Sequence, residues 1–119
     1  MSTFTWPVRI SSLDGKRSAD VEATVDTCTF FSAMPAQVLR GLGIERVQSR
    51  RMRLADGQIV DVDLGSVWVT VDGETAPTLV VFGEDGAPIL LGAYALEGLR
   101  LLVDPEGERL IPNEEIPLY

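Results

Sequence analysis

Apolar and polar residues alternate along much of the chain, which is typical of strands with one buried face. The first such run spans residues 4–10, where every second residue is apolar. Pro7 lies inside this run and indicates an edge or terminal position, because proline cannot donate a hydrogen bond to a neighbouring strand. Asp14-Gly15 is a turn signal, so we expect this strand to form a hairpin with the next one.

The next run, residues 19–26, ends in a carboxylate. Four apolar residues alternate with four polar ones, and Asp26 is the last polar residue. The alternation places Asp26 on the polar face, at the point where the strand ends. Such an aspartate is either a solvated turn residue, as is common at strand ends, or part of a site.

The middle of the chain predicts one short helix and more hairpins. The helix should begin at Pro35 and end at Gly41 and Gly43. Alternation returns over residues 50–71, with a turn at Asp56-Gly57 and a break at Gly65-Ser66. A further turn at Asp72-Gly73 leads to a strand over residues 77–82.

The C-terminal part continues the mixed pattern. After a loop over residues 83–88, the apolar run 89–91 predicts a strand buried on both faces. A short helix over 93–99 and two short strands around a turn at 104–107 follow. The tail, 112–119, is expected to be peripheral unless it pairs across a dimer. Roughly eight short strands and two short helices predict a closed, mostly β domain.

Length and charge limit the classes of partner. The 119 residues predict one domain, 1–119, small enough that a dimer interface would help its stability. The net charge of −8 argues against nucleic acid and anionic membrane surfaces as partners. The basic segment from Arg46 to Arg53 is interrupted, and we expect it to be a solvated strand edge.

Targeting features and cysteine content indicate the compartment. No apolar run approaches the ~18 residues of a membrane span, and the first residues lack the features of a signal peptide. A lone cysteine, Cys28, allows no internal disulfide and fits a reducing compartment. These observations predict a cytoplasmic location.

The sequence contains no histidine. This excludes Ser-His-Asp and Cys-His nucleophilic machinery, and it removes the usual zinc ligands. We therefore predict no metal and no cofactor. Carboxylates become the leading candidates for any hydrolytic chemistry.

Six short motifs occur in a fixed order: Val25-Asp26-Thr27, Met34-Pro35, Ala55-Asp56-Gly57, Ile89-Leu90-Leu91-Gly92, Leu96-Glu97-Gly98-Leu99 and Val103-Asp104-Pro105. In this order, over residues 19–112, the chain resembles the retropepsin-like aspartic peptidases, in particular the small bacterial and archaeal members. The resemblance implies a closed retropepsin-like acid-protease β-barrel with one or two short helices.

The resemblance also implies a chemistry. In such enzymes two carboxylates bind a water and share one proton, because like charges so close cannot both ionise. The chain has one Asp-Thr motif, so an active enzyme must be a homodimer in which each chain contributes one Asp26.

The resemblance assigns supporting roles to other residues. Thr27 would lock the two catalytic loops together, and Leu91 and Gly92 would support the loop from beneath. A flap over about residues 54–59, including Ala55, Asp56 and Gly57, would close over a peptide or protein substrate bound as an added strand.

Two positions depart from the family pattern. Cys28 replaces the glycine that follows Asp-Thr, and Phe30 replaces a serine or threonine. Glycine is used where a side chain would intrude, so Cys28 puts activity in question. Cys28 is a tolerated small residue, the mark of a degenerate site, or a thiol that pairs with its symmetry mate or senses oxidation. Phe30 and Phe31 are expected in the core, with narrowing of the cleft as a second role for Phe30.

Three functions remain open from the sequence. The leading one is a dimeric aspartic endopeptidase that hydrolyses peptide bonds. The second is a catalytically silent dimer of the same fold that binds peptides or serves in assembly. The third is a small β-barrel domain in which Asp26 is only a turn residue.

Overall fold

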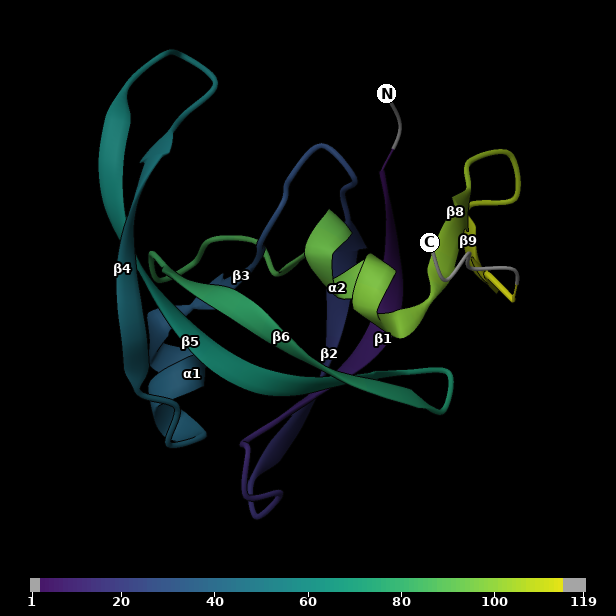
Figure 1. The fold of residues 1–119 in the computed structure, drawn as a ribbon, viewed down its shortest axis with the longest axis horizontal. Helices are drawn as coiled ribbons and strands as arrows, with labels where there is room; N and C mark the ends of the chain where they lie inside the picture. Colours follow the sequence, from purple (N-terminus) through teal and green to yellow (C-terminus); the bar gives the residue numbers. More distant parts are fainter. Residues whose placement is uncertain (1–2, 115–119) are drawn as a thin grey trace.

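Nine strands and two short helices make up residues 3–114, the part of the chain that this computed structural model describes (Figure 1). Their bounds are β1 (Phe4–Ser11), β2 (Ser18–Val25), β3 (Ser32–Pro35), α1 (Ala36–Gly41), β4 (Arg46–Arg53), β5 (Ile59–Val71), β6 (Glu74–Gly83), β7 (Leu90–Leu91), α2 (Ala93–Leu99), β8 (Leu101–Asp104) and β9 (Arg109–Pro112). The mostly β fold predicted from the sequence is confirmed. Residues 115–119 of the predicted peripheral tail lie outside the described residues.

Seven strands form one sheet in the order β1-β2-β7-β3-β6-β5-β4, and β8 and β9 form a small second sheet. Residues Arg9 to Ser11 of β1 also pair with β5, so the sheet curls back on itself. The predicted hairpin of β1 and β2 is present, with Pro7 opposite Glu22. Pro7 lies outside the stretch that pairs with β5, in agreement with the edge position predicted for it.

Two parallel pairings bring distant parts of the chain together. β2 pairs with β7 through Thr24 and Val25, and β3 pairs with β6 along its whole length. Strand β3 was not predicted, because its sequence Ser-Ala-Met-Pro shows no marked alternation. Its position between β7 and β6 completes the middle of the sheet.

The break predicted at Gly65-Ser66 is wrong, because β5 runs without interruption from Ile59 to Val71. A Cβ at position 65 would lie 2.8 Å from the side chain of Ile44 and 3.0 Å from the ring of Phe82. Gly65 therefore serves close packing within the strand rather than a turn.

Both predicted helices are present. Pro35 is the N-cap of α1 rather than its first helical residue, and Gly43, with φ of 76°, follows the helix as predicted for its end. Helix α2 covers the predicted residues, and its apolar side packs against β6. Within residues 3–114, neither helix is long and apolar enough to cross a membrane.

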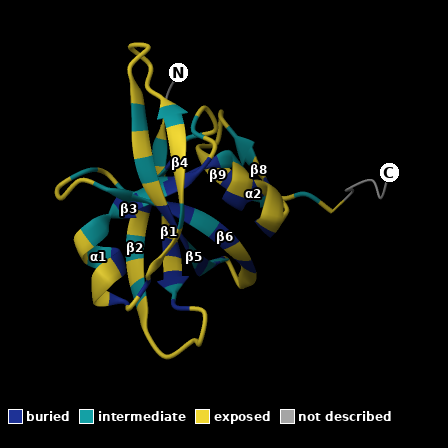
Figure 2. Ribbon diagram, turned by 60° about the vertical axis from the view of Figure 1, so that its left-hand side comes forward, coloured by how far each residue is buried: buried dark blue, intermediate teal, exposed yellow. Residues whose placement is uncertain are grey.

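The core lies between the curled sheet and the two helices. Val67, Val69 and Val71 of β5 are at most 1% exposed, and Leu39 of α1 and Leu99 of α2 pack into the same cluster. Figure 2 shows the buried residues in the body of the molecule, whereas the hairpin of β4 and β5 extends from it and is largely exposed or half-buried.

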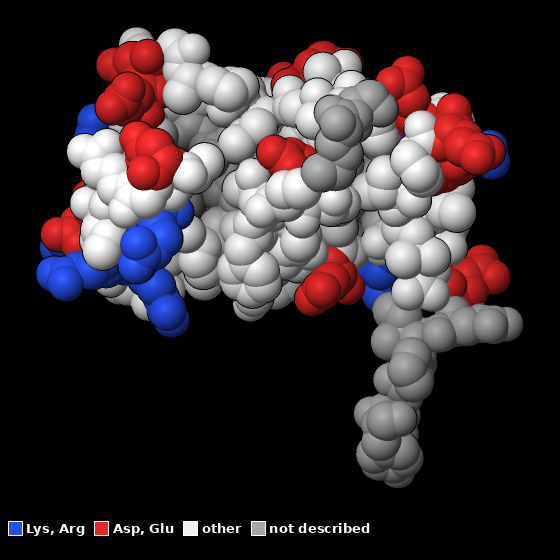
Figure 3. All heavy atoms as spheres, turned by 90° about the horizontal axis from the view of Figure 1, so that it is seen from above, with Lys and Arg blue, Asp and Glu red and all other residues white. Residues whose placement is uncertain are grey.

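Strand β4 forms the far edge of the sheet, as predicted for the basic segment, and most of its residues are exposed. Figure 3 shows most of the blue side chains of that face at the left, the side on which Figure 1 places the β4–β5 hairpin. Red side chains are spread along the rest of the face.

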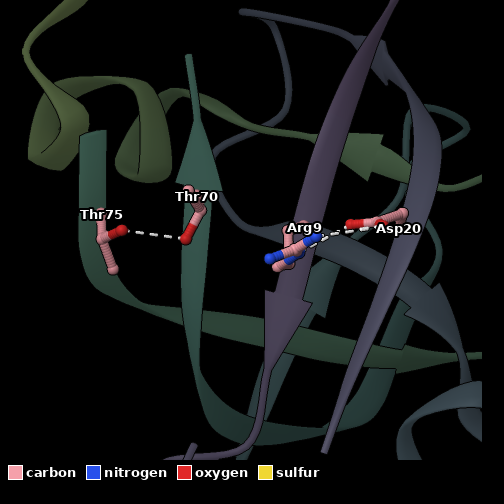
Figure 4. Close-up of polar contacts among 4 residues, drawn as sticks. All are labelled: Arg9, Asp20, Thr70 and Thr75. Atoms are coloured by element: carbon pink, nitrogen blue, oxygen red, sulfur yellow. Dashed lines mark hydrogen bonds and ion pairs between the residues drawn. The ribbon is translucent and has the colours of Figure 1, made fainter. Parts of the chain in front are cut away.

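Polar pairs fix the register of the strands on the outer side of the sheet (Figure 4). Arg9 of β1 donates to both carboxylate oxygens of Asp20 on β2, at 2.8 and 3.3 Å. This hydrogen bond lowers the pKa of Asp20 below its ordinary value. The hydroxyls of Thr70 and Thr75 lie 2.9 Å apart across the β5–β6 hairpin.

Candidate functional site

Asp26 directly follows β2 and begins the loop that leads to β3. Its backbone N–H donates to the carbonyl of Leu91 on β7 at 3.1 Å, which extends the parallel pairing by one step. Its own carbonyl accepts from the N–H of Thr29 at 3.3 Å. The backbone of Asp26 is therefore held from the sheet on one side and from the loop on the other.

The carboxylate of Asp26 accepts a hydrogen bond at each oxygen. The backbone N–H of Cys28 donates to Oδ1 at 3.0 Å, and the hydroxyl of Thr29 donates to Oδ2 at 3.1 Å. Both donors come from the same loop, so they fix the orientation of the carboxyl group. The sequence analysis did not predict this role for Thr29. The only local sign of it is a hydroxyl residue three positions after the aspartate.

Thr27 and Cys28 are both exposed at the tip of this loop. Cys28 does not belong to the residues with positive φ, so its backbone conformation does not require glycine. The thiol is therefore compatible with the loop itself. Whether it is compatible with a bound peptide depends on the space above the loop.

Leu91 and Gly92 lie beside the Asp26 loop. A Cβ at Gly92 would lie 2.7–2.8 Å from backbone atoms of Phe30 and Phe31, so only glycine fits this approach. The N–H of Gly92 donates to the hydroxyl of buried Ser32 at 3.0 Å. Ser32 was also missed by the sequence reasoning, because nothing in the sequence links it to a residue sixty positions away.

The start of α2 holds the same loop from its other end. The N–H groups of Ala93 and Tyr94 donate to the carbonyls of Thr29 and Phe30, at 2.9 and 3.0 Å. The loop that orients the Asp26 carboxylate is therefore fixed to β7 and to α2 by backbone hydrogen bonds.

The predicted burial of Phe30 is wrong, because its side chain is 53% exposed, whereas Phe31 is 9% exposed, as predicted. The two rings meet edge-on, with centroids 4.9 Å apart. Phe30 also meets the ring of Tyr94 edge-on at 5.5 Å, and Tyr94 is 40% exposed. Two exposed aromatic rings thus adjoin the Asp26 loop.

A cleft of about 420 Å³ opens beside Asp26. It is lined by residues from the N-terminus, the Asp26 loop and the end of β8: Thr3, Phe4, Val25, Asp26, Thr27, Val103 and Pro105. Among these described lining residues, Asp26 carries the only carboxyl group.

Asp104, which lies between two of the lining residues, is engaged elsewhere. Its carboxylate accepts from the N–H of Gly107 at 3.2 Å and from Nε of Arg109 at 2.9 Å. The hydrogen bond from Arg109 is the main reason that the pKa of Asp104 is lowered. Asp104 therefore stabilises the β8–β9 turn. Within residues 3–114, no three His, Cys, Asp or Glu side chains gather to hold a metal ion.

Ala55, Asp56 and Gly57 form the turn at the tip of the β4–β5 hairpin. Gly57 has φ of 88°, and the carboxylate of Asp56 accepts from the N–H of Gln58 at 2.9 Å. Figure 1 shows this tip at the upper left, well apart from the loop that follows β2. The structure thus brings Thr27, Cys28, Leu91 and Gly92 together around Asp26 and leaves the hairpin tip open.

Comparison with solved structures agrees with this architecture. The chain is similar to the solution structure of the protease of simian foamy virus (mac), with a TM-score of 0.53 and 15% sequence identity. The match covers 76% of this chain and 91% of the viral one, and it shows a retropepsin-like fold. No protein-family model matches the chain, and none of the curated proteins compared with it does.

Proposed function

We propose that the protein is a homodimeric aspartic endopeptidase of the retropepsin-like type. The observation that carries the proposal is the oriented carboxylate of Asp26, held by Cys28 N–H and Thr29 Oγ1 at the edge of an open cleft. Backbone hydrogen bonds from β7 and α2 hold the loop that carries this carboxylate in place.

Aspartic peptidase chemistry needs two carboxylates, and the cleft beside Asp26 supplies one. The second is supplied by a two-fold partner whose Asp26 lies next to the first across the axis. Thr27 is exposed beside Asp26 and is the residue that would hydrogen-bond across this axis.

In the dimer, one water lies between the two carboxyl groups, which share a single proton because like charges so close cannot both ionise. The ionised carboxylate takes a proton from the water while the oxygen of the water attacks the scissile carbonyl carbon. The protonated carboxyl group donates its proton to the carbonyl oxygen. Collapse of the tetrahedral intermediate breaks the C–N bond. The carboxyl group that took the proton of the water gives it to the leaving amine, and one hydroxyl of the intermediate returns its proton to the other carboxylate.

One observation favours a second candidate, a silent dimer of the same fold that binds peptides or serves in assembly. Cys28 places a thiol where the family pattern has glycine, and Phe30 places an exposed ring on the same loop. Both side chains belong to the loop that carries Asp26, and they would reduce the room for a substrate backbone bound there.

The test combines association state with cleavage. Sedimentation at micromolar concentration should show a dimer, and a mixed peptide library should be cleaved within the range from about pH 4 to 7. The Asp26→Ala chain is the blank. Cleavage that survives Asp26→Ala, or a strictly monomeric active species, refutes the proposal, and a folded dimer without cleavage favours the silent one.

A further inference from the structure

The β4–β5 hairpin carries positive charge on an otherwise acidic protein. Four of the ten basic residues of the chain, which has a net charge of −8, lie in the eight residues of β4: Arg46, Arg50, Arg51 and Arg53. Figure 3 shows this concentration of blue side chains next to a recess between the hairpin and the middle of the molecule.

Strand alternation assigns each arginine to a face of the hairpin. Val67, Val69 and Val71 of β5 point into the core, and β5 has no break, so Ile59, Asp61 and Asp63 follow on the same face. Arg53 lies opposite Ile59 and Arg51 opposite Asp61, and both therefore share this core-side face. Arg50, opposite Val62, lies on the outer face.

The core-side face holds one more cation than it holds anions. Arg46 and Arg51 approach Asp63 and Asp61 at 3.8 and 3.7 Å, in exposed ion pairs. Arg53 instead donates to the carbonyl of Gly57 at 3.4 Å, the outer limit of a hydrogen bond. The guanidinium nearest the tip thus lacks a carboxylate among its contacts in the described residues.

Two exposed apolar residues are neighbours of this cation. Ile59, directly across from Arg53, is 52% exposed, and Leu54, next to it, is 44% exposed. Arg53 and these two apolar side chains are therefore open to a ligand that approaches the hairpin.

We propose that Arg53 determines substrate specificity by pairing with an Asp or Glu side chain of the bound peptide. The inference rests on the proposed function, because it assumes that an extended peptide binds under the hairpin. A guanidinium pairs with a carboxylate through two parallel hydrogen bonds, which a neutral amide of the same shape cannot match. The substrate class is therefore acidic peptide segments.

The experiment measures binding rather than cleavage, in the full-length Asp26→Asn chain. The probes are pools of labelled eight-residue peptides, each fixed as either Glu or Gln at one position and mixed elsewhere. At one position or more, the Glu pool should bind about tenfold tighter than the Gln pool, as expected for one added charged hydrogen-bond pair. Salt should reduce this difference.

Arg53→Met in the same background should abolish the preference for Glu. Arg50→Met is the matched control, since it removes the same charge from the outer face of the same strand. It should leave the ratio of Glu-pool to Gln-pool affinity within about twofold of the parent's ratio, because exposed charges act weakly at a distance. Thermal unfolding of both variants should match the parent, because both side chains are exposed.

Three results overturn the inference: equal binding of Glu and Gln pools, equal losses from Arg53→Met and Arg50→Met, or no binding of any pool. A Glu preference in a dimer that never cleaves peptides refutes only the peptidase proposal, and cleavage without that preference refutes only this inference.

Discussion

The hydroxyl of Thr29 lies 3.1 Å from Oδ2 of Asp26 and donates a hydrogen bond to it. The other carboxylate oxygen accepts from a backbone N–H, which a side-chain substitution leaves in place. Thr29 is therefore a side chain that orients the proposed catalytic carboxylate.

Thr29→Val removes this hydroxyl and keeps the shape of the side chain. We expect kcat/KM for peptide cleavage to fall about tenfold, the rate equivalent of one lost hydrogen bond. Thr29→Ser keeps the hydroxyl and should retain most of the activity. Equal activities of the Val and Ser variants would show that the hydrogen bond has no role in catalysis.

Cys28→Gly separates the peptidase from the silent dimer. If Cys28 crowds an otherwise intact site, glycine clears space for substrate backbone beside Asp26, and cleavage of the peptide library rises. Glycine also loosens the loop, so the free energy of unfolding should fall by about 0.5–1 kcal/mol. Absence of cleavage by both the parent and the glycine variant would contradict the peptidase proposal.

Gly92→Ala tests the close approach of α2 to the Asp26 loop. The new Cβ would meet backbone atoms at 2.7–2.8 Å, and we expect a loss of about 1–3 kcal/mol in the free energy of unfolding, measured in urea. Gly98→Ala is the control within α2, because its Cβ has no neighbour closer than 3.7 Å. Alanine there should raise stability by about 0.5–1 kcal/mol. An unchanged free energy of unfolding in Gly92→Ala would show that the Asp26 loop can shift to make room for the new Cβ.

Asp104→Asn tests the turn that borders the cleft. The pKa of Asp104 is lowered from its ordinary value of 3.8, chiefly by the hydrogen bond from Arg109. A carboxyl group whose pKa is lower in the folded state than in the unfolded state stabilises the fold at pH values above its unfolded-state pKa. This contribution is lost as the pH falls through the folded-state pKa. The melting temperature of the variant should therefore be lower than that of the parent at neutral pH. The difference should disappear once the pH is below the folded-state pKa of Asp104.

The control for Asp104→Asn is Glu106→Gln, an exposed change in the same turn, which should not alter the melting temperature at either pH. The melting temperatures of the parent and Asp104→Asn could also differ by the same amount in strong acid as at neutral pH. That result would show that the carboxylate charge does not provide the stabilisation.

The sequence predicts the local elements well, since hairpins and short helices depend on nearby residues. The β1–β2 hairpin and α2 lie where turn signals and periodicity place them. Strand β3 escapes prediction because only its neighbours β6 and β7 make it a strand. The predicted break at Gly65 is wrong because the close packing of this glycine against Ile44 is a tertiary contact.

The candidate site divides in the same way. Asp26 and its neighbours are adjacent in sequence, and the resemblance to known peptidases points to them. Ser32 and the exposure of Phe30 depend on α2, which is distant in the chain. Side chains that depend on such long-range contacts carry no local signal.

The parallel pairing of β2 with β7 also sets an order of events in folding. Closing so long a stretch of chain costs entropy before any contact compensates for it, so this pairing forms late. Until Leu91 and Gly92 reach the sheet, the loop after β2 lacks the backbone partners that hold it. During synthesis from the N-terminus, the Asp26 loop is therefore made early but gains its partners on β7 and α2 late, so the loop is fixed to the sheet only when most of the chain has been made.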